Sequence, residues 1–188
     1  VAIGSSAGQR NQGTQAVAIG TSAGNTGQRS GAVAIGSSAG QINQGTQAVA
    51  IGSSAGQTQQ GTNAVAIGNA AGSFTQGANA VAIGNSAGLT GQGASAIAIG
   101  NNAGRTNQLA GSIVIEAGGS GAITASSAGF YVAPVRSTAN TSNYIVYDTT
   151  TKELQYSTSR VVVADSATIA IGSFAGSVSQ GLNAVAIG

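Results

Sequence analysis

The sequence contains no cysteine, histidine, tryptophan or methionine, and it has one proline and only 5% charged residues among its 188. Without cysteine and histidine it has no disulfide scaffold, no thiolate or imidazole metal ligand and no nucleophile–histidine pair. The net charge of +2 is too small for a nucleic-acid interface, and no apolar run approaches the roughly 18 residues of a membrane span. We therefore expect no cofactor, no metal site, no nucleic-acid partner and no membrane insertion.

What the sequence has in quantity is glycine, 31 residues, arranged in a 16-residue internal repeat. The motif Val-Ala-Ile-Gly begins at Val1 and returns at the same place in every repeat, ending as Ile-Ala-Ile-Gly at Ile97 and Ile-Val-Ile-Glu at Ile113. A further pair of motifs begins at Ile169 and Val185. Glutamine, usually followed by glycine, recurs with the same spacing. Because the chain begins and ends within this pattern, we expect it to be a segment of a longer protein.

The repeat predicts short β-strands. Ala-Val-Ala-Ile-Gly alternates with period two, and the frequent glycines would weaken a helix by up to ~1 kcal/mol each. Gly40 and Gly56 follow the strand motif and are expected to adopt positive φ in a turn. We predict an all-β parallel β-solenoid (a β-roll or β-helix), in which each repeat is one coil of two strands and two turns, stacked about 4.8 Å apart. The repeated glutamines are predicted to form a ladder along the stack.

Both faces of the predicted strand are non-polar, whereas a solvent-exposed strand alternates apolar with polar residues. We expect the large residues to fill the coil interior and the small ones to meet another chain, although the reverse assignment stays open. A coil this short has little core of its own, so we expect a closed homo-oligomer of three chains. The large residues predicted for the coil core or trimer assembly are Val17, Ile19, Val33, Ile35, Val49, Ile51, Val65, Ile67, Val81, Ile83, Ile97 and Ile99.

Residues 113–167 lose the repeat and hold all four tyrosines, the only proline and every acidic residue. This change predicts three segments: solenoid repeats at 1–112, a β-rich cassette at 113–167, and resumed repeats at 168–188. Within the cassette, Tyr144–Tyr147 and Glu153–Tyr156 flank a polar loop and predict a β-hairpin.

The cassette also holds the candidate binding residues. Phe130–Val135 predicts a strand that Pro134 confines to a sheet edge or to its end. Tyrosine is favoured at recognition surfaces, and loops on a rigid scaffold often carry binding residues. Packing of the same tyrosines in a small core is the alternative. The candidate receptor-binding residues are Tyr131, Arg136, Tyr144, Tyr147 and Tyr156.

Catalysis is not expected. Glycoside hydrolysis needs a pair of carboxylates, and the chain offers only Glu116, Asp148, Glu153 and Asp165. Two of these flank a turn beside Lys152, which is typical of a solvated hairpin end. The coils contain no aspartate, so a calcium-binding solenoid is not expected either. We therefore expect no catalytic residue and predict that the protein is not an enzyme.

The segments VAIGSSAG and AVAIGNSAG resemble the head repeats of YadA-like trimeric autotransporter adhesins, which form a left-handed parallel β-roll in a trimer. The adhesin repeat is shorter than the 16-residue repeat of this chain. The Gln-Gly-x-x-Ala segment of this chain is also not the usual form of the adhesin repeat. A closer resemblance is to repeat-bearing attachment and tail-fibre proteins of phages and large DNA viruses, where similar units are interrupted by cassettes like GFYVAPVRS and YIVYDTTTKELQYS. This resemblance implies a homotrimeric fibre on the virion surface that attaches to a cell-surface glycan or protein receptor.

Other functions stay open. The first alternative is a bacterial adhesin head on the outer surface of the cell. A purely structural fibre spacer and an ice-binding solenoid are further alternatives, although ice binding needs regular threonine rows. The row that begins Thr14, Ser30 and Thr46 ends in alanine at Ala78, Ala94 and Ala110. An enzyme that degrades surface polysaccharide ranks last.

Overall fold

The described residues of this computed structural model form short β-strands joined by turns, and the prediction of an all-β protein is confirmed for them. No helix in this part of the chain is long and apolar enough to cross a membrane. The chain divides into two compact units, Val1–Val135 and Arg136–Gly188, which are described separately. The described residues are 1–117, 123, 125, 127–135, 144–157, 168–171 and 184–187.

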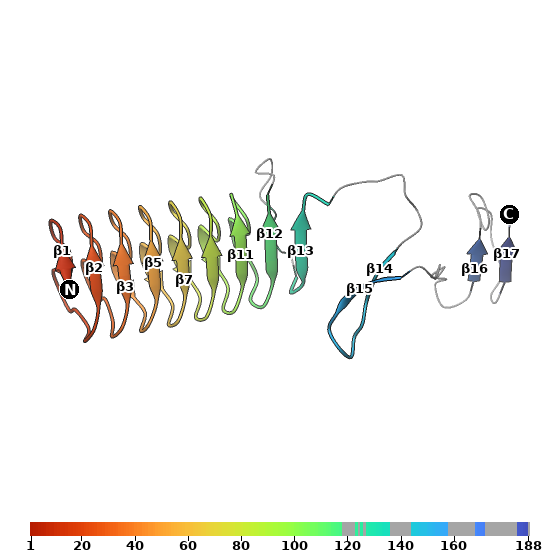
Figure 1. The fold of residues 1–188 in the computed structure, drawn as a ribbon, viewed down its shortest axis with the longest axis horizontal. Helices are drawn as coiled ribbons and strands as arrows, with labels where there is room; N and C mark the ends of the chain where they lie inside the picture. The colour runs from red at the N-terminus through yellow and green to blue at the C-terminus, as the bar shows by residue number, and fades with distance from the viewer. Residues whose placement is uncertain are drawn as a thin grey trace. The chain divides into compact units, whose positions relative to one another are not determined.

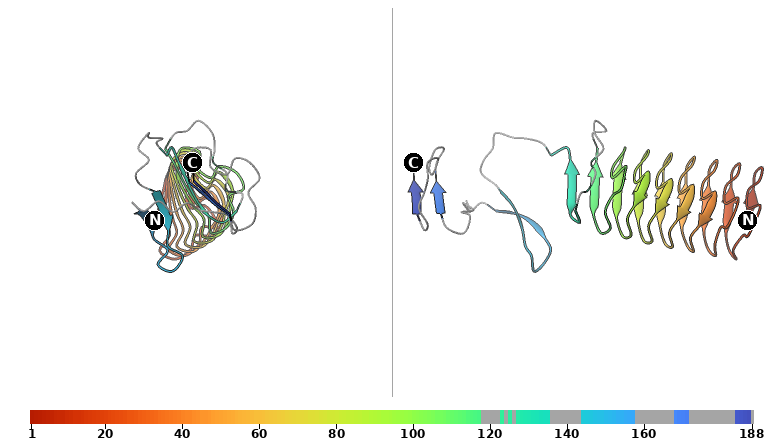
Figure 2. Two further views of the ribbon diagram at one scale, coloured as in Figure 1. Left: turned by 90° about the vertical axis from the view of Figure 1, so that its right-hand side faces the viewer. Right: turned by 180° about the vertical axis from the view of Figure 1, so that it is seen from behind.

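The first unit is a parallel β-solenoid of about eight coils, whose Val-Ala-Ile strands lie side by side in one nine-stranded sheet (Figure 1). Partners on neighbouring strands are one repeat apart over most of this sheet, so Val17 lies opposite Val33 and Ile19 opposite Ile35. Seen along the stack, the coils superimpose on one cross-section (Figure 2). The nine strands are β1 (Ala2–Ile3), β2 (Val17–Ile19), β3 (Val33–Ile35), β5 (Val49–Ile51), β7 (Val65–Ile67), β9 (Val81–Ile83), β11 (Ile97–Gly100), β12 (Ile113–Glu116) and β13 (Phe130–Ala133).

The segment of each repeat that ends at the recurring glutamine forms a second parallel sheet, with the strand order β10-β8-β6-β4. Single bridges between Arg10 and Thr26, Thr26 and Ile42, and Thr90 and Thr106 extend the same ladder into neighbouring coils. Each such coil therefore has two strands joined by turns, as the repeat predicts. The four strands are β4 (Ile42–Gln44), β6 (Thr58–Gln60), β8 (Phe74–Gln76) and β10 (Thr90–Gln92).

Glycine is required at two bends of each coil. Gly40 and Gly56 both have φ of 50°, which confirms the predicted turn conformation, and a Cβ at Gly56 would lie 2.7 Å from the carboxamide carbon of Gln60. Gly52 has φ of 125°, and a Cβ there would lie 2.6 Å from the carbonyl oxygen of Gly68 in the next coil. The other positive-φ residues of this coil carry side chains: Ser54, Gln59 and Asn63.

Alanine and glutamine fill the interior of the solenoid. In one coil, Ala50, Ala55 and Ala64 are fully buried and Gln60 is 2% exposed. The Gln60 amide donates to the carbonyls of Val49 at 2.8 Å and Ala64 at 3.3 Å, so its side chain reaches across the coil. This leaves room only for methyl groups on the opposite strand.

The expectation that the large residues fill the coil interior is therefore wrong. The Val-Ala-Ile strands turn their alanines inward, and the valines and isoleucines lie on the outer side, half-buried or exposed. Their proposed part in trimer assembly stays a prediction. The residues concerned are Val17, Ile19, Val33, Ile35, Val49, Ile51, Val65, Ile67, Val81, Ile83, Ile97 and Ile99.

The predicted glutamine ladder is confirmed. The side-chain amide of one coil donates to the amide oxygen of the next at 3.1, 3.1 and 3.3 Å. The Oε1 atoms of Gln28, Gln44 and Gln60 are buried without a hydrogen-bond partner among the described residues, so the continuous chain of amides starts at the fourth coil. Its members are Gln60, Gln76, Gln92 and Gln108.

The solenoid extends further along the chain than its repeat. Strand β12 pairs in parallel with β11, and β13 pairs in parallel with β12, so both belong to the nine-stranded sheet. The first unit accordingly runs to Val135, and the predicted boundary after Ser112 is too early. Strand β13 ends at Ala133, directly before Pro134, and is the last strand of the sheet, as predicted.

The second unit contains the predicted hairpin, in which β14 (Tyr144–Tyr147) pairs antiparallel with β15 (Leu154–Ser157). It also contains a parallel pair, β16 (Thr168–Ile171) and β17 (Ala184–Ile187). In this pair Ile169 lies opposite Val185, which is the same offset as between neighbouring coils of the first unit. The predicted boundary after Ala167 lies outside the described residues.

Candidate interaction surfaces

The outward residues of the nine-stranded sheet form a continuous apolar surface, which we call the Val/Ile face. The valines that begin β2, β3, β5, β7 and β9 are half-buried, as are the isoleucines that begin β11 and β12. The isoleucines two residues later stack in register along the rod and are 36–37% exposed from the third coil onward. These exposed isoleucines are Ile35, Ile51, Ile67, Ile83, Ile99 and Ile115.

The Val/Ile face continues past the end of the regular repeat. In β13, Phe130 lies opposite Ile113 and Val132 opposite Ile115, and the two are 50% and 43% exposed. The residue between them changes from alanine in the repeats to Tyr131. Single exposed apolar residues are ordinary on protein surfaces, but a contiguous apolar patch marks an interaction site.

Tyr131, a candidate receptor-binding residue, packs against the end of the alanine core. Its hydroxyl donates to the carbonyl of Ser127 at 3.1 Å and lies 2.9 Å from the Ser127 hydroxyl. These are the contacts of a packing residue. The other four candidates belong to the second unit. Of them, Tyr147 is 55% exposed at the end of β14, whereas Arg136 and the side chains of Tyr144 and Tyr156 lie outside the described residues.

The hairpin loop is closed by its own backbone and by Asp148. The Asp148 N–H donates to the Glu153 carbonyl at 2.9 Å, and the Lys152 N–H donates to the Asp148 carbonyl at 2.9 Å. The Asp148 carboxylate accepts from the N–H of Thr150 at 2.7 Å and of Thr151 at 3.0 Å. Hydrogen bonds from Thr151 and Thr150 hold the pKa of Asp148 below its ordinary value, because they stabilise the ionised form.

The described carboxylates have structural partners. Glu116 is 4% exposed, and its Oε2 accepts from the N–H of Ile123 at 3.1 Å. Asp148 belongs to the hairpin loop, and Asp165 lies outside the described residues. Within the part of the chain that the structure describes, no three histidine, cysteine, aspartate or glutamate side chains gather in a way that could hold a metal ion.

Sequence reasoning missed the outward residues of the second sheet. Ile42 on β4 is 41% exposed and Phe74 on β8 is 46% exposed. The two residues sit two coils apart, with Thr58 between them on β6. Gln44 and Gln76 face the interior two residues later, and the residues between, Asn43 with φ of 56° and Thr75 with φ of 58°, interrupt the regular alternation of the strands.

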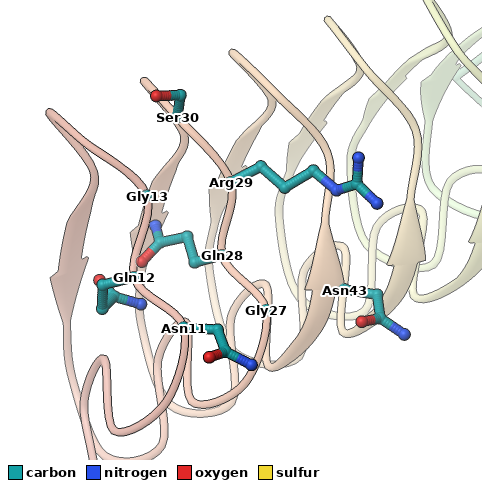
Figure 3. Close-up of a pocket in the computed structure, with 8 residues that line it drawn as sticks. All are labelled: Asn11, Gln12, Gly13, Gly27, Gln28, Arg29, Ser30 and Asn43. Atoms are coloured by element: carbon teal, nitrogen blue, oxygen red, sulfur yellow. The ribbon is translucent and has the colours of Figure 1, made fainter.

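A polar hollow of about 480 Å³ opens beside Arg29 on the glutamine side of the rod (Figure 3). A second hollow, of about 430 Å³, shares Arg29 and Asn43 with the first. Figure 3 shows the Arg29 side chain extended along the rod over the following coil. Arg29 is not among the residues singled out from the sequence.

Comparison with known proteins gives no match: no family model, no curated protein and no solved structure is similar to this chain. Its function is therefore argued from the surfaces described above.

Proposed function

We propose that the first unit is a rod segment of a homotrimeric surface fibre, and that the chain serves attachment to a host cell or surface. Its work is mechanical and binding, without a catalytic step. The observation that carries the proposal is the Val/Ile face, an apolar surface that runs without interruption over nine strands.

The folding of its own chain leaves part of the Val/Ile face uncovered. The interior is already filled by alanine and glutamine, and isoleucines such as Ile51 keep 37% of their surface exposed. Full burial of an isoleucine stabilises a protein by roughly 1.5–3 kcal/mol, so covering the exposed part is worth about 0.5–1 kcal/mol for each residue. Six isoleucines together would add about 3–6 kcal/mol for each chain on association.

A second copy of the same chain suits this surface because its isoleucines repeat at one spacing along the rod, and only an identical rod repeats at that spacing. The number three is supported by the resemblance of the repeat to trimeric fibres. Three copies of a weak receptor site would then gain avidity without new contacts. We place the fibre on a virion surface, or alternatively on the outer surface of a bacterium, with a glycan or protein as the receptor.

Replacing Ile51 by Asp tests the assembly. The variant places a charge in a surface that association would dehydrate, which costs several kcal/mol. The matched control is Ile42→Asp, since Ile42 is similarly exposed at 41% but lies on the second sheet. Light scattering at micromolar concentration should give three chain masses for the parent and for Ile42→Asp, and one for Ile51→Asp. A parent of one chain mass, or an Ile51→Asp variant that remains trimeric, would refute the assembly.

Removal of the hairpin tests where attachment resides. Residues 144–157 are replaced by a short glycine–serine linker, which leaves the first unit intact. We expect the shortened chain to remain trimeric and to lose binding to the cells or glycans that the parent binds, because Tyr147 and its loop are gone. Undiminished binding would show that the hairpin is structural.

A further inference from the structure

Arg29 breaks the pattern of the repeat at a position where glycine has a structural role. The residue after the interior glutamine is glycine in five of the seven regular coils: Gly13, Gly45, Gly61, Gly77 and Gly93. A Cβ at Gly45 would lie 2.5 Å from the backbone of Gly61 in the next coil. The only other exception is Leu109, which belongs to the last regular coil of the first unit.

The hydrogen bond between neighbouring coils is longer where arginine replaces this glycine. The N–H of Arg29 reaches the carbonyl of Gln44 at 3.1 Å, whereas the corresponding bonds from the five glycines measure 2.7–2.8 Å. The longer bond follows from the extra Cβ between the two coils. Arginine here departs from the glycine of the other coils, and its side chain forms no hydrogen bond or ion pair with the described residues in return.

Nothing in the described chain pairs with the Arg29 guanidinium. It is exposed and forms no hydrogen bond or ion pair with any described residue. The sequence contains no acidic residue before Glu116, so the first seven coils offer no carboxylate of their own. A residue that disturbs its own fold without compensation is expected at a functional site.

The surroundings of Arg29 are open, polar and elongated. The two hollows on either side of it are lined by residues of four consecutive coils, which at about 4.8 Å for each step extend over roughly 14 Å. Their walls carry exposed carboxamides and hydroxyls over a floor of glycine backbone. The polar wall residues are Asn11, Ser30, Asn43, Gln59 and Thr62.

We propose that Arg29 and these polar side chains form a binding groove for an acidic oligosaccharide. The guanidinium supplies bidentate hydrogen bonds to a sugar carboxylate. The carboxamides and hydroxyls donate to and accept from sugar hydroxyls along the groove. Because the groove lies on the glutamine side of the rod and not on the nine-stranded sheet, it requires neither trimer formation nor the hairpin, and so goes beyond the function proposed above.

The test measures binding of a short oligogalacturonate to the full chain by calorimetry. Its methyl ester, in which the carboxylate charge is removed, is the matched ligand control. The protein variant is Arg29→Gly, which restores the glycine of the other coils and should fold. Arg105→Gln is the protein control, because it removes the same charge and restores the residue found at Gln41 and Gln57.

We expect oligogalacturonate to bind the parent and Arg105→Gln alike, and Arg29→Gly to bind roughly tenfold to hundredfold more weakly. The methyl ester should bind as weakly to the parent as the acid binds to Arg29→Gly. An equal loss of oligogalacturonate affinity in Arg29→Gly and Arg105→Gln would show that binding depends only on the net charge of the protein, and it would overturn the proposal. Absence of binding, equal binding of the ester, or equal binding of polyglutamate would overturn it as well. Chain mass measured on the same samples reports trimer formation separately.

Discussion

The interior glutamines are predicted to hold the coils together, and Gln76 is the most informative one to replace. Its amide donates to the Val65 carbonyl at 2.8 Å and to the Gln92 Oε1 at 3.1 Å, and its own Oε1 accepts from Gln60 at 3.1 Å. Leucine at this position keeps most of the volume and removes every one of these bonds. The change therefore isolates hydrogen bonding from the creation of a cavity.

The magnitude follows from the bonds that disappear. A buried hydrogen bond contributes about 1 kcal/mol net, so loss of the bonds to Val65 and Gln60 removes about 2 kcal/mol. The Oε1 of Gln92 loses its donor in the dry interior, and an orphaned buried acceptor costs a further 1–3 kcal/mol or so. We expect Gln76→Leu to lower the free energy of unfolding by about 3–5 kcal/mol, a large share of the roughly 5–15 kcal/mol that stabilises a typical domain.

Gln57→Leu is the matched control, since Gln57 is half-buried and the equivalent position of a later coil already carries Leu89. It loses a partly buried bond of 3.2 Å to Gln41 and a long one of 3.5 Å from the Ser73 hydroxyl, and should cost about 1 kcal/mol. Both variants are unfolded in denaturant at one protein concentration, because association shifts apparent stability. Equal unfolding midpoints for Gln76→Leu and Gln57→Leu would show that the amide ladder does not stabilise the coil.

Two further outcomes test the turns. Gly52→Ala should destabilise the chain by more than about 3 kcal/mol in thermal unfolding, because φ is 125° and the new Cβ would lie 2.6 Å from the Gly68 carbonyl oxygen. Gly31→Ala is the control and should cost about 1 kcal/mol, because φ is 68° and the new Cβ would lie 3.4 Å from the Gln47 side chain. The Asp148 carboxyl should titrate by NMR below its ordinary pKa, and protection of the Thr150 and Thr151 amides should persist above the lowered pKa and disappear as the pH falls through it. An ordinary titration of Asp148 would refute the loop geometry.

The repeat was sufficient to predict the coil, because its spacing fixes both the alternation of the strand and the register of the stack. It did not decide which face of the strand points inward. Hydrophobicity favours Val49 and Ile51 for the interior, but the interior width is set by Gln60, whose amide must reach the opposite strand. A polar residue with a structural position inside the coil thus reversed the rule that large apolar residues are buried.

The end of the solenoid was misplaced for a related reason. The cassette was recognised by composition, and composition changes at Ile113, where acidic and aromatic residues begin. Pairing depends instead on backbone register and on outward apolar residues, and both continue through β12 and β13. The sequence also did not show that Arg29 occupies a position where glycine is favoured. That preference comes from the short distance between the backbones of neighbouring coils, which the residue spacing alone does not give.

Comparison of the coils with one another indicates what each position is required to do. Interior alanines and glutamines are repeated in the regular coils because the glutamine side chain crosses the coil and leaves little room on the opposite strand. Outward positions on the glutamine side of the rod vary in both size and polarity, as the row of Arg10, Thr26, Ile42, Thr58 and Phe74 shows. The outward isoleucine of the Val-Ala-Ile strands is also repeated in every regular coil, although space inside the coil does not demand it. The homotrimer proposed above accounts for an outer position that does not vary, because a second rod with the same spacing would cover the part of each isoleucine that its own chain leaves exposed.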